Sequence, residues 1–368
     1  MIAVPVDGPV VAPLRLATRR SALAMAQSRQ VGEQLAALTG RPLELVEVTS
    51  QGDVDLAPLT QIGGTGVFVV AVRQAVVDGR ADVAVHSLKD LPTAPDSRLR
   101  IAAIPLRADP RDALVARDGA TLSDLPMGAR VGTGSPRRRA QIVAARPDVE
   151  VVDIRGNVDT RMARVIGSAG SADHGATEPA GDLDAVVLAA AGLARLGRAA
   201  SITETLEPEQ VMPAPGQGAL AVEVRADLDP DSGVDTSATA LTDALRRLDD
   251  PHSRAAVAAE RSLLAALEAG CSAPIGALAV VEDGPEPTVH LRAVLARPDG
   301  SLVRMSSSGP IEQAVLIGRR LAGEVLAGTH GVLDQAAMTG PTTDRGPNTA
   351  TGPFTAGGPI PAHRGSIE

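Results

Sequence analysis

The side chains best suited to chemistry in this chain of 368 residues are Lys89 and Asp90, which follow the apolar run 83–85. Lys89 is the only lysine, since every other cation among the 35 Lys plus Arg residues is an arginine. In a chain with this composition, a lysine needed only for solubility would have been replaced by arginine as well. Lysine carries a compact ammonium and arginine a planar fork of donors, so position 89 is expected to need the point charge of an ammonium. We therefore expect a functional pair, although an ordinary solvated turn after a strand is an equal alternative.

Arginines gather at three turns where a predicted strand leads into a predicted helix. These arginines are Arg19 and Arg20, then Arg137 to Arg139, then Arg155 and Arg161. Such turns direct backbone N–H groups and the positive end of a helix dipole outward, which favours an anion. Arg137 and Arg138 fall in a first helical turn, where the dipole disfavours cations, and a bound anion would relieve the repulsion. A merely exposed arginine run is the alternative.

The elements that position these residues alternate between strands and helices. With 44% hydrophobic and 1% aromatic residues, the core must consist of Val, Leu, Ile and Ala, which suits buried parallel strands covered by helices. Segments 109–112 and 213–218 fit two crossings between domains. They predict a hinged α/β body with a discontinuous first lobe, 14–108 with 212–232, and an inserted second lobe, 109–211. The carboxyl ends of strands from both lobes would then face a common cleft.

Beyond a polar linker at 227–239 the pattern changes. Two helices, three short strand runs and a final helix predict an α+β domain over 238–337. The Gly, Ser and Ala rich stretch 167–181 reads as a flexible insertion. Residues 338–368 are rich in Gly, Pro and Thr and predict a disordered tail.

Composition excludes several classes of function. The net charge of -9 and the lack of aromatic platforms argue against a nucleic-acid partner. One cysteine, Cys271, and six scattered histidines exclude a disulfide and any multi-cysteine metal site, so we expect no metal. The sequence has no recognisable signal peptide and no run that could span a bilayer, which predicts a cytoplasmic protein with no membrane partner.

Seven motifs in register resemble the porphobilinogen deaminase family, also called hydroxymethylbilane synthase. They are Ala17–Arg19, Val85–Pro92, Gly132–Arg138, Arg155–Asn157, Ala191–Leu193 with Arg195, Gly216–Gly218 and Gly270–Cys271. Each is weak alone, but the ordered set from about Leu14 to Ala327 is specific. The resemblance implies a two-lobed body like that of periplasmic binding proteins plus a small α+β C-terminal domain, in agreement with the two crossings.

The resemblance also implies an activity and a cofactor. The family is a transferase of tetrapyrrole, porphyrin and heme biosynthesis, which condenses four porphobilinogen molecules stepwise with loss of ammonia. Hydrolysis then releases the linear tetrapyrrole hydroxymethylbilane. A dipyrromethane cofactor primes the chain, and here it would be attached covalently through Cys271, the only cysteine. We expect a monomer.

Site residues follow from the matched positions. Asp90 would be catalytic, because one carboxyl group can protonate the departing amine and then stabilise the cationic methylene left behind. The cofactor would be bound by Lys89, Ser135, Arg137, Arg138, Arg155 and Gly156. The substrate would be bound by Arg19, Ser21, Phe68, Arg161, Arg195 and Gln217. The apolar stripe that carries Phe68 favours core packing for that residue instead. Lys89 would either restrain the Asp90 charge or bind a substrate carboxylate, and the sequence leaves both open.

Three positions depart from the family pattern. Gln61 and Thr65 stand where many relatives have lysines, and Gly134 replaces one of two serines before the arginine helix. Two other functions fit parts of the sequence. A solute-binding module would need only the two lobes, and a transferase without a covalent cofactor would use Cys271 as a buried structural thiol. Fold alone does not decide between them.

Overall fold

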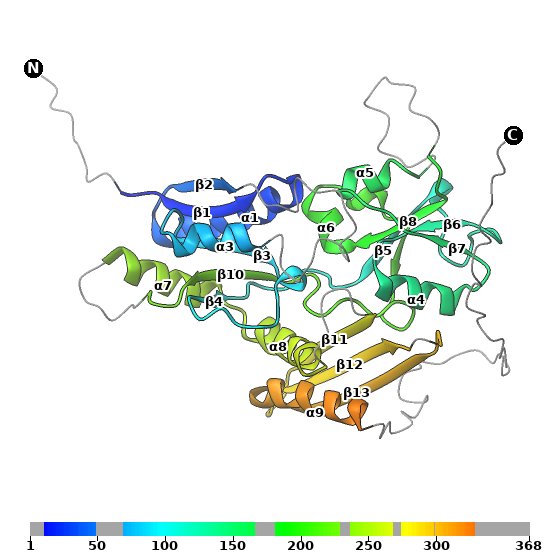
Figure 1. Ribbon diagram of the computed structural model, residues 1–368. Helices are drawn as coiled ribbons and strands as arrows, with labels where there is room; N and C mark the ends of the chain where they lie inside the picture. Colours follow the sequence, from blue (N-terminus) through cyan, green and yellow to red (C-terminus); the bar gives the residue numbers. More distant parts are fainter. Residues whose placement is uncertain are drawn as a thin grey trace, which may run out of the picture.

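The computed structural model describes residues 11–48, 69–165, 181–228, 236–267, 274–297 and 299–327. These residues form two five-stranded sheets and one three-stranded sheet (Figure 1). Several predicted features lie outside the described residues: Gln61, Thr65, Phe68, Cys271, the insertion apart from Gly181, and the 338–368 tail.

The first sheet has the strand order β2-β1-β3-β10-β4. Its strands are β1 (Leu14–Arg19), β2 (Leu43–Val48), β3 (Val83–Ser87), β4 (Leu99–Ala103) and β10 (Leu220–Arg225). Strand β1 is parallel to β2 and β3, whereas β10 is antiparallel to β3 and β4. Three helices cover this first sheet: α1 (Ala22–Thr39), α3 (Val70–Val77) and α7 (Thr236–Leu248). The buried side chains between sheet and helices are valine, leucine and alanine, as the composition predicts.

The second sheet repeats this plan with the order β7-β6-β8-β5-β9. Its strands are β5 (Asp112–Ala116), β6 (Arg130–Gly132), β7 (Glu150–Val152), β8 (Ala185–Ala189) and β9 (Glu204–Leu206). Its helices are α4 (Pro136–Ala145), α5 (Val158–Met162) and α6 (Ala190–Arg195). Strand β6 is parallel to β7 and β8, and β5 is antiparallel to β8 and β9.

Each crossing leads directly into an antiparallel strand of the next lobe: the first crossing into β5 and the second into β10. Asp112, the first residue of β5, pairs with Ala189, the last residue of β8. Leu220, the first residue of β10, pairs with Ser87 at the end of β3. An antiparallel strand begins where its parallel neighbours end, so both crossings place their residues at the carboxyl edges of the two sheets.

The third domain lies below the two lobes in Figure 1, in yellow and orange. It consists of α8 (Pro251–Ala266), β11 (Ile275–Glu282), β12 (Thr288–Ala296), β13 (Leu302–Pro310) and α9 (Ala314–Leu326). The antiparallel sheet β11-β12-β13 packs against both helices. The predicted fold class, two α/β lobes with a discontinuous first lobe plus an α+β domain, is therefore confirmed. The exact domain limits stay predictions.

One predicted boundary is wrong. The polar linker expected at 227–239 ends earlier, because α7 begins at Thr236. Leu241, Ala244 and Leu245 share the face of α7 that packs against the first sheet. Burial of that face stabilises the helix, so it extends backward through small polar residues that have no apolar periodicity of their own.

The close approach of the two crossings predicts a selective effect at Gly218. A Cβ there would lie 2.5 Å from the Ala108 carbonyl oxygen, and its φ is +86°. Gly300 has a similar φ of +84° but open space around its Cα. We expect Gly218→Ala to lower the free energy of unfolding by about 2–5 kcal/mol, and Gly300→Ala by only about 1–2 kcal/mol. Urea unfolding measures both, and equal losses would contradict the close contact between crossings.

Candidate active site

Asp90 lies in a short 3-10 turn, η1 (Leu88–Asp90), at the carboxyl end of β3. Leu88 and Leu91 are buried on either side of it, and the Leu88 N–H donates to the Ala219 carbonyl at 3.0 Å. The Asp90 side chain itself is exposed and makes no hydrogen bond or ion pair with a described residue. The turn thus holds a carboxyl group in place by its backbone and leaves both oxygens available to a ligand.

Lys89 occupies a different environment from its neighbour. Its Nζ donates to Gln217 Oε1 at 3.3 Å. Although part of the side chain is exposed, burial of the ammonium group lowers the pKa of Lys89 to about 8. The Asp90 and Asp112 carboxylates oppose this decrease, whereas the Arg138 and Arg137 cations add to it. The lone lysine is therefore a desolvated ammonium among arginines, which the solvated-turn alternative does not explain.

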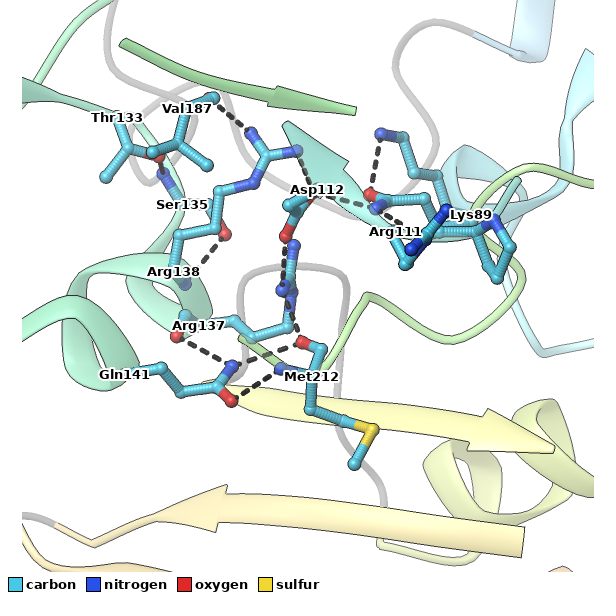
Figure 2. A network of polar contacts seen from close by, with 12 residues as sticks. Lys89, Arg111, Asp112, Thr133, Ser135, Arg137, Arg138, Gln141, Val187 and Met212 are labelled. Atoms are coloured by element: carbon cyan, nitrogen blue, oxygen red, sulfur yellow. Dashed lines mark hydrogen bonds and ion pairs between the residues drawn. The ribbon is translucent and has the colours of Figure 1, made fainter. Parts of the chain in front are cut away.

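Two of the predicted arginines share a buried carboxylate that belongs to the chain (Figure 2). Asp112 Oδ2 lies 2.9 Å from Arg137 Nη1, and Asp112 Oδ1 lies 2.7 Å from Arg138 Nη2. All three side chains are buried. Burial alone would raise the pKa of Asp112, but the two guanidinium groups outweigh it and hold that pKa well below its usual range. The exposed arginine run predicted as an alternative is therefore wrong for Arg137 and Arg138.

The remaining donors of this pair bind backbone carbonyls. Arg137 Nη1 also donates to the Met212 carbonyl of the second crossing, and Arg138 Nη1 donates to the Val187 carbonyl of β8 at 2.9 Å. Ser135 caps α4 by accepting from the Arg138 N–H at 3.4 Å. The sequence suggested that a bound anion would offset the arginines in the first turn of α4. In the structure, the carboxylate of Asp112 supplies this negative charge.

Gln217 connects the two halves of the site. Its Nε2 donates to Asp112 Oδ1 at 2.7 Å and to the Pro110 carbonyl at 2.8 Å, while its Oε1 accepts from Lys89. The side chain is 1% exposed. Its predicted role in substrate binding stays a prediction, because every contact observed for its amide is internal.

Two more of the predicted cations, Arg155 and Arg161, lie in the turn and short helix that follow β7. Arg161 Nε donates to the Gly156 carbonyl at 2.8 Å, and Gly156 itself has a φ of +104°. Burial lowers the pKa of Arg161, and the Arg138 and Arg155 cations lower it further. Arg155 is exposed, with its Nε 3.8 Å from Asp153 Oδ2.

Three further predicted residues, Arg19, Ser21 and Arg195, lie at the ends of β1, α1 and α6. Ser21 caps α1 by accepting from the Ala24 N–H at 3.4 Å, and Arg19 ends β1 just before it. Helix α1 contacts α6 of the second lobe, which ends at Arg195. Arg195 Nη2 donates to the Gly218 carbonyl at 2.7 Å, and burial lowers the pKa of Arg195 to about 10.

Buried guanidinium N–H groups that lack an acceptor indicate whether this site suits an anionic cofactor. The Nε atoms of Arg138 and Arg195 are buried and have no hydrogen-bond partner among the described residues. One carboxylate, that of Asp112, pairs with both Arg137 and Arg138, so this buried cluster has two cations for one anion. A dipyrromethane carries an acetate and a propionate on each ring, so its carboxylates would supply the charge and the acceptors that these arginines lack. The residues present fit such a group.

Sequence reasoning assigned no role to Asp112. The crossing 109–112 was recognised, but only the antiparallel pairing of β5 places its first residue beside Arg137 and Arg138. A signal did exist, because two buried cations at a helix start require a nearby anion. In the ranges that the structure describes, no group of His, Cys, Asp or Glu is placed to hold a metal ion, and no helix is long and apolar enough to cross a membrane.

Comparison with known proteins decides the family. The model "Porphobilinogen deaminase, dipyromethane cofactor binding domain" matches residues 14–231, and the model "Porphobilinogen deaminase, C-terminal domain" matches residues 255–327. The chain belongs to the porphobilinogen deaminase family. The predicted family is thus confirmed, and membership makes the chain a transferase.

Curated porphobilinogen deaminases match along most of their length. Porphobilinogen deaminase 1 of Streptomyces coelicolor is 54% identical over 336 residues, which cover 88% of this chain and 98% of that protein. The Micrococcus luteus enzyme is 54% identical over 312 residues, covering 81% and 82%. Among solved structures, the methionine binding protein MetQ gives a TM-score of only 0.34 at 11% identity over 63% of this chain and 89% of that one, so the fold rests on the sheets described above.

The environment of Lys89 predicts its titration. In a cofactor-free Cys271→Ala protein labelled with ¹³C,¹⁵N-lysine, a single side-chain NMR signal should titrate with a pKa near 8. Asp90→Asn should lower this value, because Asp90 favours the charged form, and Arg138→Leu should raise it. Since the folded pKa lies below the ordinary lysine pKa of 10.5, the contribution of Lys89 to stability should rise with pH between about 8 and 10.5. A signal that titrates above 10 would contradict the desolvated position.

Proposed function

We propose that Asp90 carries the chemistry of a transferase that condenses four porphobilinogen molecules head to tail, with loss of ammonia and final hydrolysis to hydroxymethylbilane. The observation that supports this most is the position of Asp90. Its carboxyl group is exposed and unpaired among the described residues, on a turn fixed by buried neighbours and next to a cluster of cations.

When bound, the dipyrromethane would supply the primer: the free α-carbon of its terminal pyrrole would receive the first unit in exchange for its proton, and each later unit would extend the growing chain. Within this proposal Cys271 anchors it covalently. Arg138 and Arg195 would hold its carboxylates through their unpartnered Nε atoms, and Arg155 would do so from the exposed rim. Hydrogen bonds between a guanidinium and a carboxylate are charge-assisted and stronger than neutral ones, so they contribute affinity for a polyanion.

The chain's own residues divide the remaining work. Asp90 would donate a proton to the aminomethyl nitrogen of porphobilinogen as its C–N bond breaks, so that ammonia leaves. As a carboxylate it would then stabilise the positive charge that develops on the pyrrole methylene. Lys89 next to it would keep the local charge balanced, and Arg19, Ser21 and Arg161 at the rim would bind substrate acid groups. We further propose a cytoplasmic monomer without nucleic-acid or membrane partners, which its net charge of -9 supports for nucleic acid.

Asp90→Asn should keep the fold and the attached cofactor but lower turnover by at least about 10³-fold, because proton donation and cation stabilisation are lost together. Turnover is measured as hydroxymethylbilane formed, and the cofactor as covalent mass. Asp96→Asn is the matched control, since Asp96 pairs with Arg98 at 2.8 Å in the same lobe, away from the cation cluster. Near-normal turnover in Asp90→Asn would refute its catalytic role.

Cys271→Ala should remove the covalent pyrrole mass and the Ehrlich colour and abolish product formation, although Asp90 and the arginines are unchanged. The variant should also melt at a lower temperature, because the cations lose the carboxylates that neutralise them and a ligand bound to the folded state no longer stabilises it. Ser272→Ala is the control and should retain mass, colour and activity. A structural thiol predicts preserved activity and a loss of only about 1 kcal/mol, which would end the covalent-cofactor proposal.

A further inference from the structure

We propose that Arg261 of the third domain is a positioning residue for the Asp90 turn. Arg261 Nη1 donates to the Leu88 carbonyl at 3.2 Å and to the Leu91 carbonyl at 2.8 Å, and its Nη2 donates to the Pro92 carbonyl at 2.7 Å. The inference rests on the catalytic role proposed for Asp90, which Arg261 does not itself contact.

The chemistry of arginine suits this role. The Leu91 and Pro92 carbonyls lie just past the end of the 3-10 turn, whereas the Leu88 carbonyl also accepts from the Leu91 N–H at 3.2 Å. A planar guanidinium presents several donors in a fixed fork, so one side chain can bind all three. Three carbonyls bound by one rigid group define the orientation of the turn, not only its distance. A lysine would offer a point charge at the end of a flexible stem.

Apolar packing supports the same contact. Val257, one turn earlier on α8, is buried in one cluster with Leu88, Leu91 and Ile104 of the first lobe. Both sides of the catalytic turn thus pack against a single helix of the third domain. The side chain of a residue one helical turn away lies on the same face of that helix.

A buried ionic cluster lies behind this contact. Arg73 binds Glu223 with two hydrogen bonds of 2.9 and 2.7 Å, and His86 Nε2 lies 3.1 Å from Glu223 Oε2. Burial lowers the pKa of Arg261, the Arg73 cation lowers it further, and the Glu223 carboxylate opposes both effects. Arg261 is half-buried, and both of its Nη groups donate to carbonyls of the turn.

The residue before Arg261, Glu260, joins the third domain to the first lobe and to the second crossing. Glu260 is fully buried and accepts from Arg107 at 2.6 and 3.0 Å, from the Gly216 N–H at 2.6 Å and from the Ala279 N–H at 2.8 Å. Consecutive residues of α8 thus bind Gly216 of the second crossing, Arg107 just before the first crossing, and the turn that carries Asp90. Cys271 follows the end of α8 at Ala266 by five residues in the sequence. The helix that contacts the Asp90 turn thus also precedes the proposed cofactor anchor in the sequence.

The test compares two arginines of α8. Arg261→Gln in cofactor-loaded protein should lower kcat by roughly 100-fold, because a small misplacement of a catalytic group is enough for such a loss. KM and the covalent cofactor mass should be unchanged. Arg254→Gln is the matched control: Arg254 donates to Asp249 at 2.7 Å and to the Ala102 carbonyl at 3.1 Å, so it joins α8 to the first lobe without touching the turn. Its kcat should stay near that of the unchanged protein.

Chemical rescue separates positioning from stability. Added guanidinium in the millimolar range should restore much of the kcat of Arg261→Ala without changing its melting temperature. If neither Gln nor Ala at position 261 gives folded protein, Arg261→Lys should fold and still lose about tenfold in kcat, because an ammonium cannot reproduce the fork.

Several results would overturn the proposal: an unchanged kcat in Arg261→Gln or Arg261→Lys, equal losses in Arg261→Gln and Arg254→Gln, or no recovery with guanidinium. The proposed function fails separately. Turnover retained in Asp90→Asn would remove the catalytic role whatever Arg261 does, whereas an inactive Asp90→Asn beside a normal Arg261→Gln would remove only the positioning role.

Discussion

The buried carboxylate of Asp112, shared between Arg137 and Arg138, is the interaction on which the site depends. Removing one partner of a buried ion pair leaves an uncompensated charge, which is strongly destabilising. Here one carboxylate serves two cations, so the cluster keeps an excess of positive charge. The carbonyls of Met212 and Val187 accept hydrogen bonds from Arg137 Nη1 and Arg138 Nη1, whereas Arg138 Nε has no acceptor among the described residues. The protein thus builds a cationic site that is stable enough to fold and still able to receive an anion.

The Asp112 carboxylate also connects the arginine pair to the two crossings between the lobes. Asp112 comes from the first crossing, and Gln217, which donates to it and accepts from Lys89, comes from the second. Any movement of the lobes about the crossings therefore changes the surroundings of Lys89 and of the arginine pair together. Gly218 lets the crossings approach closely. Glu260 attaches the second crossing, and Arg107 just before the first, to the third domain.

The arginines act largely through backbone carbonyls. Arg137, Arg138, Arg195 and Arg261 all donate to main-chain oxygens, and in each case the contact joins elements that are distant in sequence. A fork with several donors can bind a ligand carboxylate and a carbonyl at once, whereas an ammonium concentrates its charge at one point. This difference gives a physical reason for one lysine beside Asp90 in a chain whose other cations are arginines.

The sequence by itself determined the elements and the chemistry they carry. Apolar runs and caps such as Ser21 and Ser135 are local, so strands, helices and their turns could be predicted, as could the two crossings and the family. Only the tertiary structure decided which residues meet. Asp112 counters the arginine pair because β5 runs antiparallel, and Arg261 reaches the Asp90 turn because α8 packs beneath it. Such contacts depend on strand direction and domain packing, which no local pattern encodes, whereas the type of each side chain and its place along a strand or helix are written in the sequence.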